Sequence, residues 1–322
     1  MKDAIKQFHK QFAYNAKIEN VSLFKRRKKI IVLGMGGSHL AADILLAYDH
    51  FLDIKIHSDY GLPSINETQL KKTLVIASSY SGNTEEVIDG LETALAKKMD
   101  VVVVATGGRL IAIAKERNLP YIQLPDTGIQ PRLALGFSIK ALLKIINFKE
   151  GLKEVKELKK LLKPQDYEKS GQELAAKLKD CVPVIYASTA NRAIAYNWKI
   201  KLNETGKIPA FCNVVPELNH NEMTGFDVAD ASAHLSKNFY FILLKDEGDD
   251  KRVQKRMLIL EKLYQDRGLK VEVISLEGQS RLHAIFASLI LADWTALYTV
   301  QHYGLEAEQV PMVEEFKKIM KQ

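Results

Sequence analysis

Cysteine is scarce in this sequence: only Cys181 and Cys212 occur among 322 residues. Two thiols suit a reducing compartment, and they do not form the C-x-x-C spacing typical of a metal site. No apolar run reaches the roughly 18–20 residues needed to cross a bilayer, and Met1–Asn15 lacks the apolar core of a secretion signal. We therefore expect a cytoplasmic protein that has no membrane partner and holds no metal ion.

Aromatic side chains are missing from the basic parts of the chain. The net charge is +7, and basic residues gather locally at Lys25–Lys29 and Lys153–Lys163. Nucleic-acid sites usually interleave such residues with aromatic groups that stack on bases. Clusters without them are usually solvated helix faces, although a basic surface also attracts anionic substrates. We expect no nucleic-acid partner.

Short apolar strands alternate with helical segments along the whole chain. The expected strands are residues 30–33, 54–58, 73–77, 101–105, 121–124, 182–187, 239–244 and 271–274. This rhythm predicts open parallel sheets that are covered by helices on both faces. A charged helix over 148–163 stops at Pro164. We therefore expect an α/β fold with two doubly wound parallel-sheet domains, residues 1–150 and 151–322.

A hydroxyl-rich turn follows the buried strand at 73–77. The segment Thr73–Val87 reads T-L-V-I-A-S-S-Y-S-G-N-T-E-E-V, so strand, turn and helix start are contiguous. The first N–H groups of a helix have no internal partner and carry partial positive charge, which suits an anion. Ser79, Ser81 and Thr84 would add donors, and Gly82 allows a close backbone approach. The segment predicts a phosphate monoester site, with an ordinary N-cap cluster as the alternative.

A glycine turn, Gly34–Ser38, follows the first strand. G-x-G after a strand suggests a dinucleotide fold, in which Asp59 could bind the ribose. However, His39 occupies the third glycine position, and the G-K-[ST] of a P-loop is absent. The turn does suit the hydroxyls or phosphate of a sugar. A tight turn that binds no ligand is the other possibility.

Together the two turns resemble those of the sugar isomerase (SIS) domain. Three later motifs extend the resemblance: Q-P-R-L-A-L-G from Gln130, K-L-N-E from Lys201 and P-E-L-N-H-N-E from Pro216. With them, nearly the whole chain is similar to the bifunctional phosphoglucose/phosphomannose isomerases. The resemblance implies two packed SIS domains and a cofactor-free aldose–ketose isomerase that acts on hexose 6-phosphates. It also implies a homodimer whose active site lies at the subunit interface.

Carried over by motif, the family's residue roles fall on both halves of the chain. The implied binding residues are Ser79, Ser81 and Thr84 for the phosphate, with Gly37 and Ser38 along the sugar. The implied catalytic residues are Arg132 at the enediolate, Glu204 as the base, and His220 with Lys317 for ring opening. Lys318 adjoins Lys317 and is an alternative to it. Gln309 and Val310 are the candidates for the position that makes room for a mannose phosphate.

Elementary chemistry agrees with these roles. Moving a proton between C1 and C2 needs one base that faces both carbons, and a carboxylate such as Glu204 suits this. Arg132 lies among apolar residues and should need an anionic partner. Glu217, three residues before His220, could orient its imidazole. Ile194 and Trp198, on the helix that carries Glu204, are expected in the core.

Two other functions fit parts of the sequence. A non-enzymatic sugar-phosphate sensor would keep the hydroxyl-rich turn but would need neither Glu204 nor His220. Such regulators usually carry a DNA-binding helical module, and about 28 residues before the first strand are too few for one. A dinucleotide-dependent oxidoreductase would rest on Gly34, Gly36 and Asp59.

Overall fold

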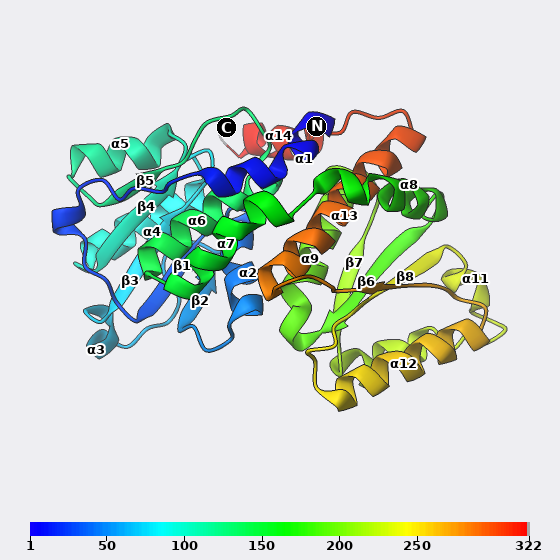
Figure 1. The fold of residues 1–322 in the computed structure, drawn as a ribbon. Coiled ribbons are helices and arrows are strands. Elements are labelled where there is room, and N and C mark those ends of the chain that lie inside the picture. The colour runs from blue at the N-terminus through cyan, green and yellow to red at the C-terminus, as the bar shows by residue number, and fades with distance from the viewer. Residues whose placement is uncertain (321–322) are drawn as a thin grey trace. The chain divides into compact units, whose positions relative to one another are not determined.

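The computed structural model describes residues 1–320 and divides into two compact units (Figure 1). The N-terminal unit comprises Gln7–Leu162 together with Ser280–His283. The C-terminal unit comprises Met1–Lys6, Lys163–Gln279 and the chain from Ala284 onward. Each unit contains one parallel sheet, and each is described by itself.

The N-terminal unit is built on a five-stranded parallel sheet in the order β2-β1-β3-β4-β5. Its strands are β1 (Lys29–Leu33), β2 (Ile54–His57), β3 (Thr73–Ser78), β4 (Asp100–Ala105) and β5 (Tyr121–Gln123). Its helices are α2 (Leu40–Tyr48), α3 (Glu67–Leu70), α4 (Glu85–Ala96), α5 (Gly108–Glu116), α6 (Leu135–Ile146) and α7 (Lys149–Leu161). All six residues of β3 are buried, as expected for a central strand that is covered on both faces.

Successive side chains along these strands point to opposite faces of the sheet. Ile31, Val75 and Val103 form one core with the apolar sides of α4 and α5. Ile30 and Leu74, one residue away, point to the opposite face and are also buried. The sheet is therefore apolar on both faces.

The C-terminal unit contains a four-stranded parallel sheet in the order β7-β6-β8-β9. Its strands are β6 (Val182–Ser188), β7 (Phe211–Val215), β8 (Phe239–Lys245) and β9 (Lys270–Ser275). Its helices are α1 (Lys2–Lys6), α8 (Glu168–Lys177), α9 (Arg192–Glu204), α10 (Glu222–Gly225), α11 (Ala233–Ser236), α12 (Lys251–Asp266), most of α13 (Arg281–His302) and α14 (Pro311–Ile319). Tyr186 and Phe241 pack on one face with Tyr264 of α12. Trp198 and Ile194 of α9 are fully buried, which confirms the core role expected for them.

The α/β fold with two parallel sheets agrees with the sequence analysis, and all eight expected strands are present. Strand β7 was missed, because Phe211 is exposed and Cys212, Asn213 and Val214 are only half-buried. An edge strand of this kind has neither a continuous apolar run nor a clear alternation. Its neighbour β6 pairs with it in parallel, with Tyr186 opposite Asn213.

The charged helix expected at the domain boundary is α7. It packs on α6 and on the 3-10 helix η1 (Phe8–Ala13). Val155 and Leu158 supply the fully buried stripe of α7. For this reason the N-terminal unit continues through the helix to Leu162, rather than ending near residue 150. The lysines of the helix lie on its exposed side, which confirms the solvated face expected for this cluster.

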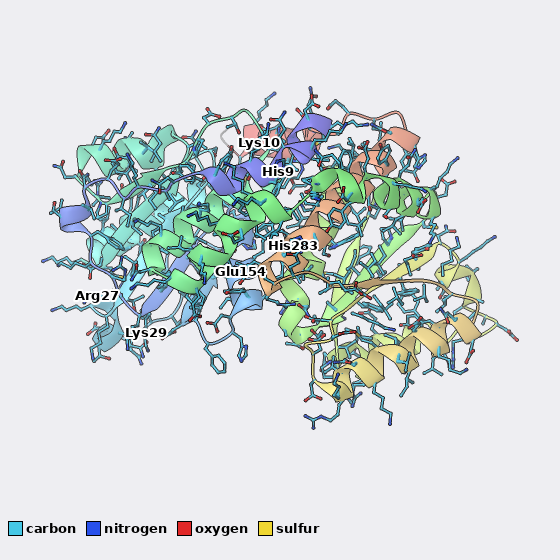
Figure 2. The ribbon with its side chains drawn as sticks, in the orientation of Figure 1. His9, Lys10, Arg27, Lys29, Glu154 and His283 are labelled. Atoms are coloured by element: carbon cyan, nitrogen blue, oxygen red, sulfur yellow. The ribbon has the colours of Figure 1, made fainter. Side chains whose placement is uncertain are left out.

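Helix α13 begins in the N-terminal unit. The N–H of Leu282 donates to Oε1 of Glu154 on α7 at 2.6 Å, and the Arg281 guanidinium donates to the carbonyl of Ala47 at 3.2 Å. Figure 2 labels Glu154 on α7 and His283 in the first turn of α13. By length and hydropathy alone α13 could span a membrane, but 89% of that apolar window is buried inside the structure. It therefore has the character of a core helix.

Candidate functional site

The two predicted turns of the N-terminal unit lie side by side at the carboxyl ends of β1 and β3. Ser38, in the 3-10 helix η3 (Gly36–Ser38) of the first turn, contacts the second. The Ser78 hydroxyl donates to the Ser38 carbonyl at 3.0 Å, and the Tyr80 N–H donates to the Ser38 hydroxyl at 2.9 Å. This is the edge at which open α/β sheets bind ligands.

The Ser79 side chain makes contacts within the hydroxyl-rich turn. Its Oγ accepts from the N–H of Gly82 at 3.1 Å and lies 2.7 Å from Oγ1 of Thr84. Ser79 is 1% exposed, whereas Ser81 is exposed and Thr84 half-buried. Thr84 is the N-cap of α4, but its side chain makes no capping hydrogen bond to the helix. The first turn of α4 therefore keeps amide donors that are not used by a side-chain cap.

Gly82 allows the turn to pack against the β4–α5 connection. Its φ is +73°, and a Cβ there would lie 1.9 Å from the carbonyl oxygen of Gly107. The Asn83 side chain also accepts from the N–H of Arg109 at 2.9 Å. Only glycine fits this crossing. Gly107 had no predicted role, although the Gly-Gly pair one residue after the predicted strand at 101–105 was a usable signal.

Arg132 joins the same edge from a third segment. The 3-10 helix η4 (Pro131–Leu133) packs on the glycine turn so closely that a Cβ on Gly37 would lie 3.1 Å from the Arg132 nitrogen. The Arg132 side chain is 1% exposed. Gln11 braces this segment, because its amide donates to the Leu133 carbonyl at 2.7 Å and its oxygen accepts from the Gly136 N–H at 3.0 Å. Gln11 was missed, since nothing local in the sequence links it to residues 133–136.

His39, which takes the third glycine position of a dinucleotide fingerprint, is buried at the start of α2. Its Nδ1 lies 2.5 Å from Oδ2 of Asp43, one helical turn further on. Asp59, the proposed ribose ligand of that alternative, is exposed and accepts from the N–H of Tyr60 at 2.7 Å. No group of three or more His, Cys, Asp or Glu side chains within residues 1–320 could hold a metal ion.

In the C-terminal unit, Glu204 is the last residue of α9 and is half-buried. The Lys207 ammonium donates to its backbone carbonyl at 2.5 Å and also to the carbonyl of Gln309. Further back on α9, Lys201 forms a fully buried ion pair with Asp293 of α13, with Nζ and Oδ1 2.5 Å apart. The end of α9 is therefore held both to a core helix and to the segment before α14.

His220 ends the 3-10 helix η7 (Glu217–His220) and is exposed. The expected contact with Glu217 is not formed among the described residues. Instead, the Glu217 carboxylate accepts from the side-chain amide of Asn221 at 2.9 Å. The prediction that Glu217 orients the imidazole is therefore wrong for this conformation.

Lys317 lies on α14, where its ammonium pairs with Glu314 at 2.8 Å. Both Lys317 and Lys318 are exposed. Gln309 and Val310 directly precede the helix, and the Lys207 contact with the Gln309 carbonyl ties this segment to the end of α9.

The chain is similar to known proteins over nearly its whole length. A bifunctional phosphoglucose/phosphomannose isomerase from Caldicellulosiruptor bescii is 32% identical, covering 96% of this chain and 92% of its own. One from Aquifex aeolicus is 30% identical, covering 98% and 97%. The chain belongs to this isomerase family. The family model for the C-terminal SIS domain of bacterial phosphoglucose isomerase also matches residues 167–320.

Solved structures support the fold assigned to this isomerase family member. A hypothetical protein of Thermus thermophilus superposes with a TM-score of 0.70 at 16% identity, covering 99% of this chain and 87% of its own. A glucosamine-6-phosphate deaminase of Thermotoga maritima gives 0.66 at 15% identity, covering 96% and 95%. At such low identity these matches show the fold alone.

The residues expected in an isomerase active site thus fall into two groups. The structure brings together six of them in the N-terminal unit: Gly37, Ser38, Ser79, Ser81, Thr84 and Arg132. The C-terminal unit holds the other three: Glu204, His220 and Lys317. Within that unit, Glu204 precedes the amino end of β7, whereas His220 follows its carboxyl end.

Proposed function

We propose that this isomerase interconverts glucose 6-phosphate and mannose 6-phosphate with fructose 6-phosphate through a cis-enediol intermediate. The observation that carries the proposal is the meeting of three segments at one sheet edge: the Ser38 turn, the Ser79–Thr84 turn and the Arg132 turn. Together they provide hydroxyl and amide donors for a phosphate monoester and a buried cation close to them.

In this proposal the phosphate binds at the amino end of α4. Ser79, Ser81 and Thr84 would contribute hydroxyl groups to it, and Ser79 also shapes the turn through its bond from the Gly82 N–H. Three terminal oxygens can use several donors at once, and the helix dipole adds to the attraction. Gly37 and Ser38 would then lie along the sugar.

The chemical step needs a base and a stabiliser of negative charge. Glu204 removes the proton from C2 of the aldose and returns it to C1, and the enediolate oxygen gains charge in between. A buried guanidinium stabilises such a developing charge strongly, because little water screens it. We assign this role to Arg132 and expect no cofactor or metal ion to take part.

His220 and Lys317 are assigned to the opening of the sugar ring. An imidazole can move a proton to the ring oxygen near neutral pH, and a lysine can share this work. The segment that carries His220 packs through Leu218 on the same core as α12. The helix that carries Glu204 packs on β6 and β7, where Ile185 and Ala187 are buried on the other face.

These positions support an active site that is shared between two copies of the chain. The five residues of β7 separate Glu204 from His220, which corresponds to about 16 Å of strand. One hexose phosphate is too small to reach both Glu204 and His220 across that distance and across both faces of the sheet. We therefore infer a symmetric homodimer in which the partner supplies His220 to each site.

Complementation between two weakly active variants tests the shared site. Glu204→Gln and His220→Ala are each expected to keep only a small, measurable residual activity as purified proteins in a coupled assay with both aldose phosphates. After co-refolding, a mixed dimer would contain one site with both changes and one intact site, so about a quarter of wild-type activity should return. If both residues act within one chain, no activity returns.

Substrate binding separates the isomerase from a sugar-phosphate sensor. Glu204→Gln should bind glucose 6-phosphate nearly as well as the wild type, because the phosphate contacts are in the other unit. Glu173→Gln, on the exposed side of α8, is the matched control and should keep full turnover. Full turnover by Glu204→Gln would remove Glu204 as the base. Binding of glucose 6-phosphate by the wild type without any turnover would leave only the sensor, and enhanced fluorescence of an added nicotinamide cofactor would favour the oxidoreductase.

A further inference from the structure

Glu222 lies two residues beyond His220, at the first position of α10. Its carboxylate accepts from the Tyr186 hydroxyl at 2.5 Å through Oε1 and from the Asn213 side-chain amide through Oε2. Both donors come from the sheet beneath it. Glu222, two residues after the proposed ring-opening residue His220, is thus held through both of its oxygens.

The two donors are neighbours on one face of the sheet. Tyr186 on β6 and Asn213 on β7 are opposite each other in the parallel register, so their side chains leave the same face of the sheet. The carboxylate of Glu222 bridges these two neighbouring strands. A bridge to two strands restrains the carboxylate more than a single hydrogen bond does, and ionised acceptors form stronger bonds than neutral ones.

Burial makes the tyrosine a persistent donor. Tyr186 is fully buried among Phe241, Tyr264 and neighbouring core side chains. This burial, together with the nearby Tyr264 and Glu222, raises the pKa of the Tyr186 hydroxyl well above its ordinary value. The proton therefore stays on the phenol through the neutral and alkaline range, and the bond to Glu222 persists with it.

The other end of the segment is also fixed. Leu218 is fully buried in the core beside α12, two residues before His220. The exposed imidazole thus lies between a buried apolar anchor and the Glu222 bridge. Among residues 1–320, the Glu217 carboxylate bonds within the segment, to Asn221, and not to the sheet.

We propose that Glu222, through Tyr186 and Asn213, is a positioning residue that sets the place of His220 in the isomerase reaction. This inference rests on the proposed role of His220. Glu222 does not itself touch the substrate: its two oxygens are occupied by the sheet, and its effect on the reaction passes through the histidine.

A double-mutant cycle tests the proposal. Glu222→Gln should lower kcat by about 10- to 100-fold, since a misplacement near 1 Å has effects of that size, while KM for the hexose phosphate stays the same. Tyr186→Phe should lower kcat in the same direction. Glu217→Gln is the matched control on the same segment and should leave kcat within about twofold of the wild type.

Coupling to His220 distinguishes positioning from a loss of folding. In the His220→Ala background, Glu222→Gln should change kcat no further, because the group it positions is gone. Equal factors in both backgrounds would overturn the proposal, and so would an unchanged kcat in Glu222→Gln. A normal kcat in His220→Ala alone would instead remove the proposed role of His220. Thermal unfolding of each variant shows whether it remains folded at the assay temperature.

Discussion

Thr84→Val isolates one proposed phosphate contact with little change of shape. Valine keeps the β-branched form and replaces Oγ1 by a methyl group, which also removes the 2.7 Å contact of Oγ1 with Ser79 Oγ. Oγ1 does not cap α4, so the helix start is retained. A hydrogen bond to a charged group is worth about 1.5–3 kcal/mol. At 1.4 kcal/mol per factor of ten, its loss should weaken phosphate binding by about 10- to 150-fold.

Two measurements check this value. The KM for fructose 6-phosphate in a coupled assay should rise by the expected factor, with a smaller change in kcat, since the contact is uniform between substrate and transition state. The inhibition constant of inorganic phosphate should rise by the same factor. Thr93→Val, on the same helix beyond the turn, should change neither constant. Unchanged KM and inhibition constants in Thr84→Val would refute a phosphate site at the start of α4.

Three further predictions concern the frame of the site. Gly82→Ala should lower stability, measured by calorimetry, and substrate affinity, measured by kinetics, more than Gly61→Ala does. Both positions have positive φ, which costs about 1–2 kcal/mol for alanine, but of the two only Gly82 would place its Cβ 1.9 Å from a carbonyl oxygen. Lys201→Met should lower the melting temperature by about 6–20 °C, since removing one partner of a buried ion pair costs about 3–5 kcal/mol. Adding Asp293→Leu should restore most of the lost melting temperature. Burial, with Glu19 nearby, raises the pKa of Tyr14 from 10.0 to about 12. The protonated Tyr14 hydroxyl therefore stabilises the fold below pH 10, and this stabilisation is lost as pH rises through 12. A difference spectrum against Tyr14→Phe should titrate near pH 12.

Much of this protein is readable from short stretches of sequence. The strands of the first sheet and the strand, turn and helix around Ser79–Thr84 are contiguous, so local hydrophobicity and turn residues suffice to predict them. The end of α9 at Glu204, just before Thr205-Gly206, was predictable for the same reason. Exposed edge strands such as β7 lack this local signal, and β7 was accordingly missed.

Only the tertiary structure decided which partners these segments meet. Gln11 reaches Leu133 across 122 residues, Lys201 reaches Asp293 across 92, and Tyr186 reaches Glu222 across 36. Sequence spacing cannot predict such pairs, because strand order and register determine which side chains share a face. The sequence by itself predicted Glu204 and His220 as site residues, whereas the folded chain placed them before and after one strand, β7.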